Sequence, residues 1–108
     1  IVNSGSNIIS YDPNAIIGGL NNIYPNPFNP ITTIEYNVIK DGYLKLNIYN
    51  IKGQLVDELL NTSKVKGNYK IIWDANDYNS GIYFIRYNFY DDNKVLDYTM
   101  TEKLILIK

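Results

Sequence analysis

Residues 23–34 decide how the chain is organised, and they read Ile23-Tyr24-Pro25-Asn26-Pro27-Phe28-Asn29-Pro30-Ile31-Thr32-Thr33-Ile34. Each proline fixes its own φ at about −65°, removes a backbone donor and keeps the preceding residue out of the helical region. Such a stretch cannot sit inside a sheet ladder, so we expect a stiff, extended arm whose large anchors are Tyr24 and Phe28. The sequence then predicts a tail over residues 1–22 and a β-domain over residues 23–108.

Downstream of the arm, apolar residues recur at every second position, which is the period of a β-strand. Strands are predicted over residues 31–39, 43–49, 54–60, 69–74, 82–90, 95–101 and 103–107, the last two forming one bent strand or two short ones. The side chains expected to face the core include Ile34, Tyr36, Val38, Leu44, Leu46, Ile48, Tyr69, Ile71 and Trp73. Trp73, the single tryptophan, is the expected core anchor because of its large apolar surface.

Turn residues separate these strands. Asp41-Gly42 is typical of a hairpin turn, and a second turn ends on Gly53, where a positive φ is expected. Residues 61–68 are expected to be a polar connector, and a short helical turn is an alternative at the end of the 54–60 strand. Residues 82–90 are apolar on both faces, which predicts a central strand that is covered on two sides or contacts a partner. These features predict an all-β fold, an immunoglobulin-like antiparallel β-sandwich of about seven strands.

The composition excludes several classes of function. The 108 residues suffice for one domain with a modest core, and no apolar run is long enough to cross a bilayer. The net charge is −1 and Arg86 is the single arginine, which argues against nucleic-acid binding through phosphate contacts. Without cysteine or histidine, the chain cannot form Cys–His or Ser–His nucleophile pairs, His or Cys zinc sites, or thiol redox centres. The sequence begins at Ile1 without a signal peptide, from which we expect a processed product or a fragment.

The tail over residues 1–22 has two interpretations. Its glycines and its proline favour a flexible linker. Its isoleucine pairs favour a segment that packs, either as an added strand in its own sheet or as a strand donated to the edge of a neighbouring chain. The candidate residues for strand donation are Ile8, Ile9, Ile16 and Ile17.

Acidic residues provide weak candidates for metal or acid–base sites. The run Asp74-Ala75-Asn76-Asp77-Tyr78-Asn79 carries oxygen ligands suited to Ca²⁺, but it lacks the full calcium-loop pattern, and turn formation by Asp and Asn explains it better. The same holds for Asp91-Asp92. Asp57 and Glu58 are neighbours on a strand and therefore point to opposite faces. Three further carboxylates are expected on solvated faces: Glu35, Asp97 and Glu102. We predict no catalytic residue, no metal site and no cofactor.

Tyrosines on the predicted strands allow a stacking platform for sugar rings as an alternative, built from Tyr43, Tyr49, Tyr83, Tyr87, Tyr90 and Tyr98. Tyrosine is also a common strand residue whose ring packs while its hydroxyl stays hydrated, and we favour that interpretation. Arg86 is expected to stack on one of these rings as a structural cation–π pair. The last strand, Leu104–Ile107, has few charges or prolines to protect its edge, so we expect something to cover it or a partner to bind it.

Four motifs in order carry a resemblance to a known family. They are Tyr24–Pro30 with the following Thr-Thr-Ile, Ile48–Val56, Ser80–Phe84 and Lys103–Lys108. Together they resemble the type A C-terminal sorting domain of type IX secretion cargo, found in Bacteroidetes and related phyla. The recognition positions that this resemblance implies are Tyr24, Pro25, Asn26, Pro27, Phe28, Asn29, Gly53, Gly81, Lys103, Leu104, Ile105, Leu106, Ile107 and Lys108.

The resemblance implies a non-catalytic module that directs its cargo across the outer membrane by binding the secretion machinery. A sortase-like peptidase then usually removes the module and attaches the cargo to surface lipopolysaccharide. Cleavage is expected in the tail before Tyr24, near Gly18-Gly19, and the protein is expected outside the cell or on its surface. The alternative is a self-assembling subunit of an extracellular filament, whose tail pairs with a neighbouring identical subunit. An enzyme is disfavoured because histidine and cysteine are missing.

Overall fold

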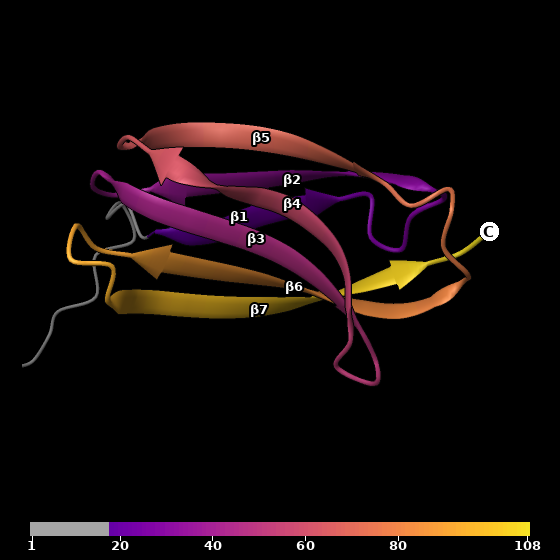
Figure 1. The fold of residues 1–108 in the computed structure, drawn as a ribbon. Coiled ribbons are helices and arrows are strands. Elements are labelled where there is room, and N and C mark those ends of the chain that lie inside the picture. The colour runs from indigo at the N-terminus through magenta and orange to yellow at the C-terminus, as the bar shows by residue number, and fades with distance from the viewer. Residues whose placement is uncertain (1–17) are drawn as a thin grey trace, which may run out of the picture.

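The computed structural model describes residues 18–108, which form two antiparallel sheets packed face to face (Figure 1). The strands are β1 (Gly19–Tyr24), β2 (Ile31–Val38), β3 (Gly42–Asn50), β4 (Leu55–Lys64), β5 (Gly67–Asp74), β6 (Gly81–Tyr90) and β7 (Leu96–Leu106). One sheet has the order β1-β2-β5 and the other the order β4-β3-β6-β7. The expected all-β sandwich of about seven strands is confirmed. Across residues 18–108 there is no helix, and thus none that would span a membrane.

The core lies between the two sheets and is built by the predicted alternation of side chains. Buried residues of β2, β3, β6 and β7 occupy every second position: Ile34, Tyr36, Val38, Leu44, Leu46, Ile48, Tyr83, Ile85, Tyr87, Phe89, Leu104 and Leu106. Trp73 of β5 is 1% exposed, and its ring lies 5.6 Å from the ring of Tyr83 in the opposite sheet, centroid to centroid. Trp73 is therefore the core anchor that the sequence predicted.

One expectation about the strands was wrong. β4 continues to Lys64, so residues 61–64 are strand and not connector. These polar residues pair with Gly42–Lys45 of β3 through their backbones, so no apolar alternation marks them. The side chains of residues 61–63 are exposed, and the Lys64 ammonium lies 4.3 Å from the centre of the Tyr69 ring.

The expectation that residues 82–90 form a central strand is confirmed by the place of β6 between β3 and β7. One face of β6 is buried and the other is only partly covered, so contact of that second face with a partner stays a prediction.

β1 crosses the expected boundary between tail and domain. Residues 19–22, expected in the tail, pair with β2 in the same sheet, and Leu20 is buried in the core. The proposed donor residues Ile8, Ile9, Ile16 and Ile17 lie outside the described residues. In a constant-type immunoglobulin domain the fourth strand joins the sheet of the first, second and fifth. Here β4 pairs with β3 in the other sheet, so the immunoglobulin-like label describes the layered architecture and not this strand order.

Candidate functional site

The four motifs, which are far apart in sequence, meet at one end of the sandwich (Figure 1). We call this the motif end and define it by residues 24–30, 50–54, 75–81 and 103–108. The register explains the meeting: Ile31 of β2 pairs with Asp74, Asn50 of β3 with Tyr83, and Gly81 of β6 with Leu106. The structure thus brings together the arm, the turn after β3, the start of β6 and the end of the chain.

The arm covers the edge of β7 that the sequence left unprotected. Phe28 N–H donates to the carbonyl of Ile105 (2.9 Å), and Ile107 N–H donates to the carbonyl of Phe28 (2.8 Å). The side chain of Asn26 continues this pattern: its Nδ2 donates to the carbonyl of Lys103 (2.9 Å), and its Oδ1 accepts from Ile105 N–H (3.0 Å). A side-chain amide presents the same donor and acceptor as a peptide group. Pro25 and Pro27 on either side of Asn26 have no backbone N–H to donate. The Asn26 side chain therefore makes the two hydrogen bonds to β7 that a backbone peptide group would otherwise make.

Three further contacts hold the arm against the body of the domain. The Phe28 ring is 2% exposed and lies 5.5 Å from the Trp73 ring. The Thr32 hydroxyl donates to the carbonyl of Pro25 (2.7 Å), and Ala75 N–H donates to the carbonyl of Pro30 (2.9 Å). Tyr24 was expected to be a second anchor, but its ring is exposed and its hydroxyl donates to Glu35 (2.8 Å).

The last residue is fixed to the loop before β6. Lys108 Nζ donates to the carbonyls of Asn76 (2.6 Å) and Tyr78 (2.8 Å), and its N–H donates to Ser80 Oγ (3.0 Å). Asp74 accepts from Asn76 N–H (3.0 Å), which confirms the turn interpretation of this loop. The loop therefore binds the Lys108 ammonium through two of its carbonyls. Among residues 18–108, no three His, Cys, Asp or Glu side chains are grouped as a metal site would need.

The turn between β3 and β4 is shaped by Asn50. Its Oδ1 accepts from the N–H groups of Lys52 (2.9 Å) and Gln54 (3.0 Å), and its carbonyl accepts from Gly53 N–H (3.0 Å). Gly53 has φ 79°, so the predicted positive φ is confirmed. The turn projects beyond the sandwich body with Ile51 at its tip, 71% exposed (Figure 1).

The tyrosines do not form a single sugar platform. Tyr83 and Tyr87 point into the core, where the Tyr87 hydroxyl donates to the carbonyl of Asn37 (2.8 Å). Positions 43, 49 and 90 lie on the outer face of the four-stranded sheet. There the Arg86 guanidinium lies 5.1 Å from the centre of the Tyr49 ring, which confirms the expected stacking.

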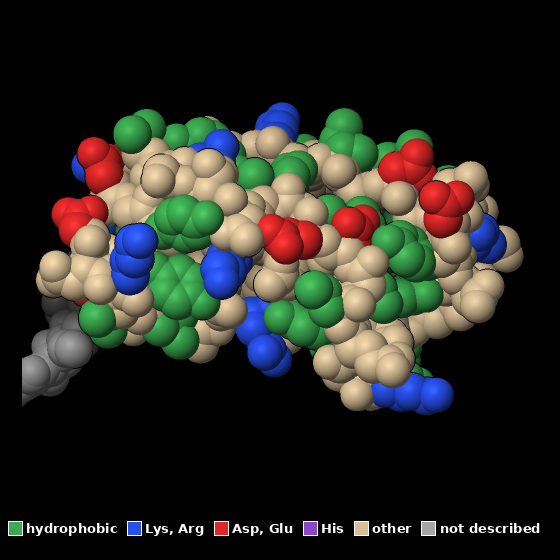
Figure 2. All heavy atoms as spheres, viewed as in Figure 1, with side chains coloured by type: hydrophobic (Ala, Val, Ile, Leu, Met, Phe, Trp, Pro, Cys, Tyr) green, Lys and Arg blue, Asp and Glu red, His purple; other side chains and the backbone are tan. Residues whose placement is uncertain are grey.

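The acidic residues mostly serve as structural partners. Asp57 accepts from Trp73 Nε1–H (2.9 Å), while its neighbour Glu58 is exposed on the other side of β4, as expected for adjacent strand residues. Two of the polar-face carboxylates form ion pairs: Glu35 with Lys70 (3.5 Å) and Asp97 with Lys40 (3.0 Å). The surface in Figure 2 accordingly mixes both signs of charge, with hydrophobic side chains exposed between them.

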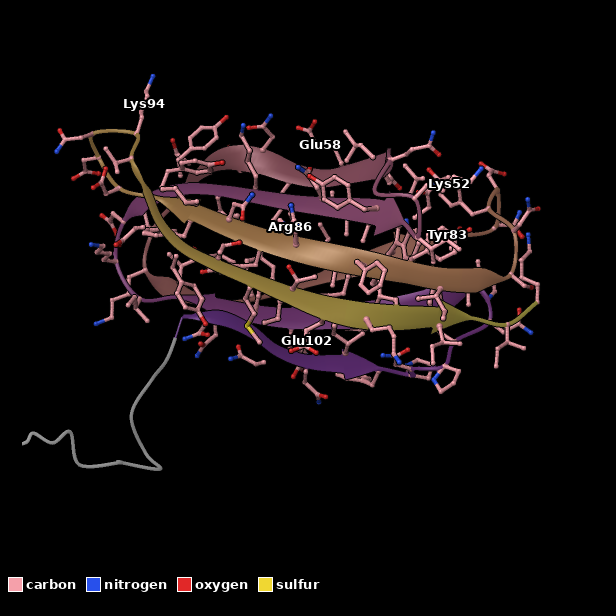
Figure 3. All side chains as sticks on the ribbon, turned by 90° about the horizontal axis from the view of Figure 1, so that it is seen from below. Lys52, Glu58, Tyr83, Arg86, Lys94 and Glu102 are labelled. Carbon is pink, nitrogen blue, oxygen red and sulfur yellow. The ribbon has the colours of Figure 1, made fainter. Side chains whose placement is uncertain are left out.

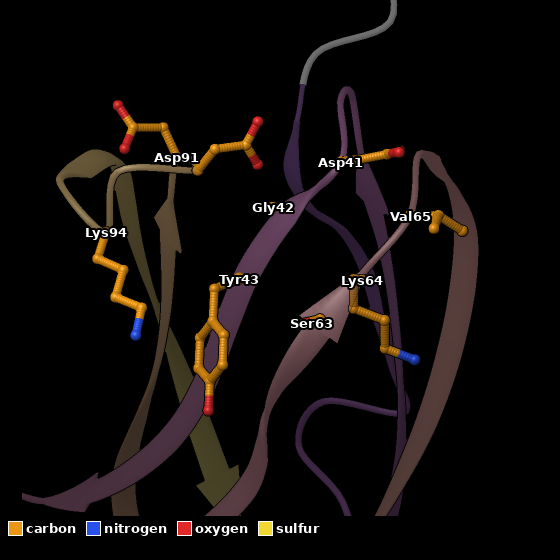
Figure 4. A pocket seen from close by; sticks show the side chains of 9 residues that line it. Asp41, Gly42, Tyr43, Ser63, Lys64, Val65, Asp91 and Lys94 are labelled. Atoms are coloured by element: carbon orange, nitrogen blue, oxygen red, sulfur yellow. The ribbon is translucent and has the colours of Figure 1, made fainter.

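A hollow of 330 Å³ lies at the opposite end of the sandwich (Figure 4). Its lining residues are Asp41, Gly42, Tyr43, Ser63, Lys64, Val65, Asp91, Asp92 and Lys94. Asp41 accepts from Lys66 N–H (2.9 Å), and Asp91 accepts from the N–H groups of Asn93 (2.9 Å) and Val95 (3.0 Å). The side chains of Lys64 and Lys94 point in different directions. The Asp41 and Asp91 carboxylates thus stabilise turns, and the Lys64 ammonium lies 4.3 Å from the centre of the Tyr69 ring.

The motif positions in the arm, at the start of β6 and at the end of the chain are therefore in contact, and Gly53 lies at the same end. Sequence reasoning missed the partners of Lys108, because nothing local marks the carbonyls of Asn76 and Tyr78 or the hydroxyl of Ser80. The alternation Pro-Asn-Pro was the one signal available for Asn26.

Comparison with protein families identifies a match to the family described as "Secretion system C-terminal sorting domain" over residues 22–106. No curated protein matches the chain. Domains of this family are in general non-catalytic, act through the secretion machinery, and mark proteins that the type IX system delivers to the cell surface or extracellular space. Because the match spans most of the 108 residues, from the end of β1 to the end of β7, the chain belongs to the secretion system C-terminal sorting domain family.

Proposed function

We propose that the chain is a non-catalytic sorting signal that the outer-membrane type IX machinery recognises in its folded form, at the motif end. The observation that supports this is the pairing of the arm with β7. Asn26 and Ile105 are 79 positions apart in sequence and are joined directly by a hydrogen bond. Such a surface exists only in the folded domain.

The pairing of the arm with β7 also indicates which groups the secretion machinery can contact. Both backbone groups of Ile105 that face the arm are already bonded, to Asn26 and Phe28. The end of β7 therefore offers side chains and shape, and not an open backbone edge for strand addition. The proposed recognition positions are Tyr24–Asn29, Gly53, Gly81 and Lys103–Lys108.

The test is export of a reporter protein fused upstream of the full chain. We expect the reporter outside cells that carry a type IX system and inside isogenic cells that lack its outer-membrane pore. Equal export in both strains, or retention in both, would contradict the proposal. A fusion carrying Asn26→Ala should be exported less than one carrying Asn22→Ala, a matched change at an exposed position of β1.

We propose that a peptidase cleaves the tail upstream of β1, close to the expected Gly18-Gly19 position. Gly19 is buried and paired with Asn37, so cleavage at Gly18-Gly19 would require the start of β1 to open. The test is mass spectrometry of the domain fragment that remains after the cargo is released: its N-terminus should lie at Gly18 or upstream of it, and a fragment that begins at Gly19 or later would contradict this placement.

Filament assembly is a second candidate. The observation in its favour is that β4 and β5 each pair on one side only within residues 18–108, and that Leu55 and Ile72 on these strands are exposed. Free strand edges permit addition of a strand from another chain. The oligomeric state distinguishes the two candidates.

A further inference from the structure

We propose that the outer face of the four-stranded sheet, at the motif end, is a docking surface for a protein partner that presents carboxylates around an apolar centre. This inference rests on the proposed sorting function and identifies which face of the motif end makes contact.

The register of the sheet assembles a row of residues across all four strands that is apolar on β4, β3 and β6 and ends on a lysine of β7. Leu55 of β4 lies opposite Tyr49 of β3, Tyr49 opposite Phe84 of β6, and Phe84 opposite Lys103 of β7. Directly opposed residues project from the same face of a sheet. One step closer to the end, Ile82 lies opposite Ile105 on this face. We call Tyr49, Leu55, Ile82, Phe84 and Ile105 the outer patch.

The outer patch is accessible. Leu55 is 54% exposed and Ile82 is 42% exposed, while the other three members are partly covered. Two further isoleucines flank it: Ile51 on the projecting turn and Ile107 just after β7, 71% and 53% exposed. An apolar patch with aromatic members on an otherwise mixed surface is typical of a protein–protein contact.

Cations outnumber carboxylates on this face, although the chain as a whole has a net charge of −1. Arg86 and Lys103 project from the same face next to the patch, and Lys45 projects from it further along β3; the single carboxylate on this face in these strand pairings is Glu58, which is paired with Asn47. Lys52 lies on the projecting turn; Figure 3 shows Arg86 in mid-sheet and Lys52 at the motif end. The complementary partner surface therefore carries carboxylates.

Two contacts within the domain fix the position of the Arg86 guanidinium. Its guanidinium stacks over the Tyr49 ring at 5.1 Å, and its Nε donates to the Thr101 hydroxyl (3.4 Å). The terminal nitrogens of a guanidinium fixed in this way can form paired hydrogen bonds with a carboxylate. Arg86 therefore loses less conformational freedom on binding a carboxylate than an arginine without these contacts would.

The charge pattern argues against a second copy of this chain as the occupant. In a two-fold dimer the same patch meets itself, which would bring the cations of one copy towards those of the other. An anionic membrane would match the charge, but the two common means of binding a bilayer surface are an amphipathic helix and a covalent lipid chain. Here the apolar side chains belong to a rigid sheet face, which favours a protein surface.

The test uses the exported reporter fused to the full chain. Leu55→Glu/Ile82→Glu removes the apolar centre, and Arg86→Glu/Lys103→Glu reverses the charge. The matched control is Lys66→Glu/Ile72→Glu, at two exposed positions, one just before β5 and one on it, in the other sheet. We expect roughly a tenfold loss of exported reporter for each patch variant and less than about a twofold change for the control, as for hot-spot and peripheral residues. Lys103→Arg should retain export because it keeps the charge.

Thermal unfolding of each purified chain confirms that a variant is folded before its export is interpreted. If the unaltered fusion is not exported, the sorting function itself fails. If it is exported and the patch variants match the control, the docking surface is wrong. Two further results would overturn the choice of partner: binding of the purified chain to vesicles containing anionic lipid that the patch variants abolish, or a dimer in solution that they dissociate.

Discussion

At the scale of single residues, two turn glycines are required for different reasons. A Cβ at Gly42 would lie 2.3 Å from Phe89 Cζ and 2.6 Å from the carbonyl of Tyr90, so no side chain fits. Gly53 has open space around it but a φ of 79°. We expect Gly42→Ala to lower the free energy of unfolding by about 2 kcal/mol or more through overpacking, and Gly53→Ala by about 1 kcal/mol through backbone strain. Urea unfolding measures both, and Gly67→Ala, whose Cβ would contact Tyr69 at 3.5 Å, is the control. Equal losses at all three positions would contradict this assignment.

Two core tyrosines predict how stability depends on pH. Burial raises the pKa of Tyr36 and of Tyr87 from the ordinary 10.0 to about 12. The folded state therefore holds these protons more tightly than the unfolded chain does. Their contribution to stability is complete below pH 10 and is lost as pH rises towards 12. We expect the free energy of unfolding to fall over this interval, and to fall less steeply in Tyr36→Phe/Tyr87→Phe. The measurement is the slope of the free energy of unfolding against pH, recorded together with tyrosinate absorbance. Identical slopes for the unaltered chain and the double variant would show that Tyr36 and Tyr87 do not cause the pH dependence.

At the scale of elements, the pairing of the arm with β7 depends on one carboxamide. Asn26→Ala removes two hydrogen bonds and leaves the Lys103 carbonyl and Ile105 N–H to water. We expect a loss of about 1–2 kcal/mol in the free energy of unfolding, because each exposed bond contributes modestly. Amide hydrogen exchange should quicken at Ile105, with little change in mid-β6. Asn22→Ala is the control, because no hydrogen bond joins its side chain to another residue in the described range. Unchanged exchange at Ile105 would mean that the arm is held without Asn26.

The elements also show which features the sequence could predict. Residues 43–49 were predicted with the correct inward face because burial on one side of a strand produces a local, alternating pattern. An added strand in its own sheet was one interpretation of the tail, but the position of β1 was missed because GLNNIY has no such alternation: it is an edge strand with a bulge, and its first residues are glycine, leucine and asparagine. The end of β4 was missed because backbone pairing needs no apolar side chain. The sequence identified the motif residues, but it did not predict which residues they contact in the folded domain. The Asn26 and Lys108 contacts join segments about 30 to 80 positions apart, and a local pattern carries no information at that distance.

At the scale of the whole molecule, the N-terminal segment determines whether the chain acts alone or assembles. β1 belongs to the three-stranded sheet, and Leu20 is 7% exposed in the core, so residues 19–22 are part of the folded domain that was expected to begin at Ile23. We expect the full chain and a chain starting at Gly18 to be folded monomers with the same unfolding temperature. A chain starting at Pro25 lacks β1, which exposes the edge of β2 and opens the core at Leu20; it should unfold at lower temperature and associate. Size-exclusion light scattering and negative-stain imaging measure this on all three chains. Filaments formed by the full chain, and absent from the chain starting at Gly18, would show that residues 1–17 drive assembly and would favour the filament subunit over the monomeric signal.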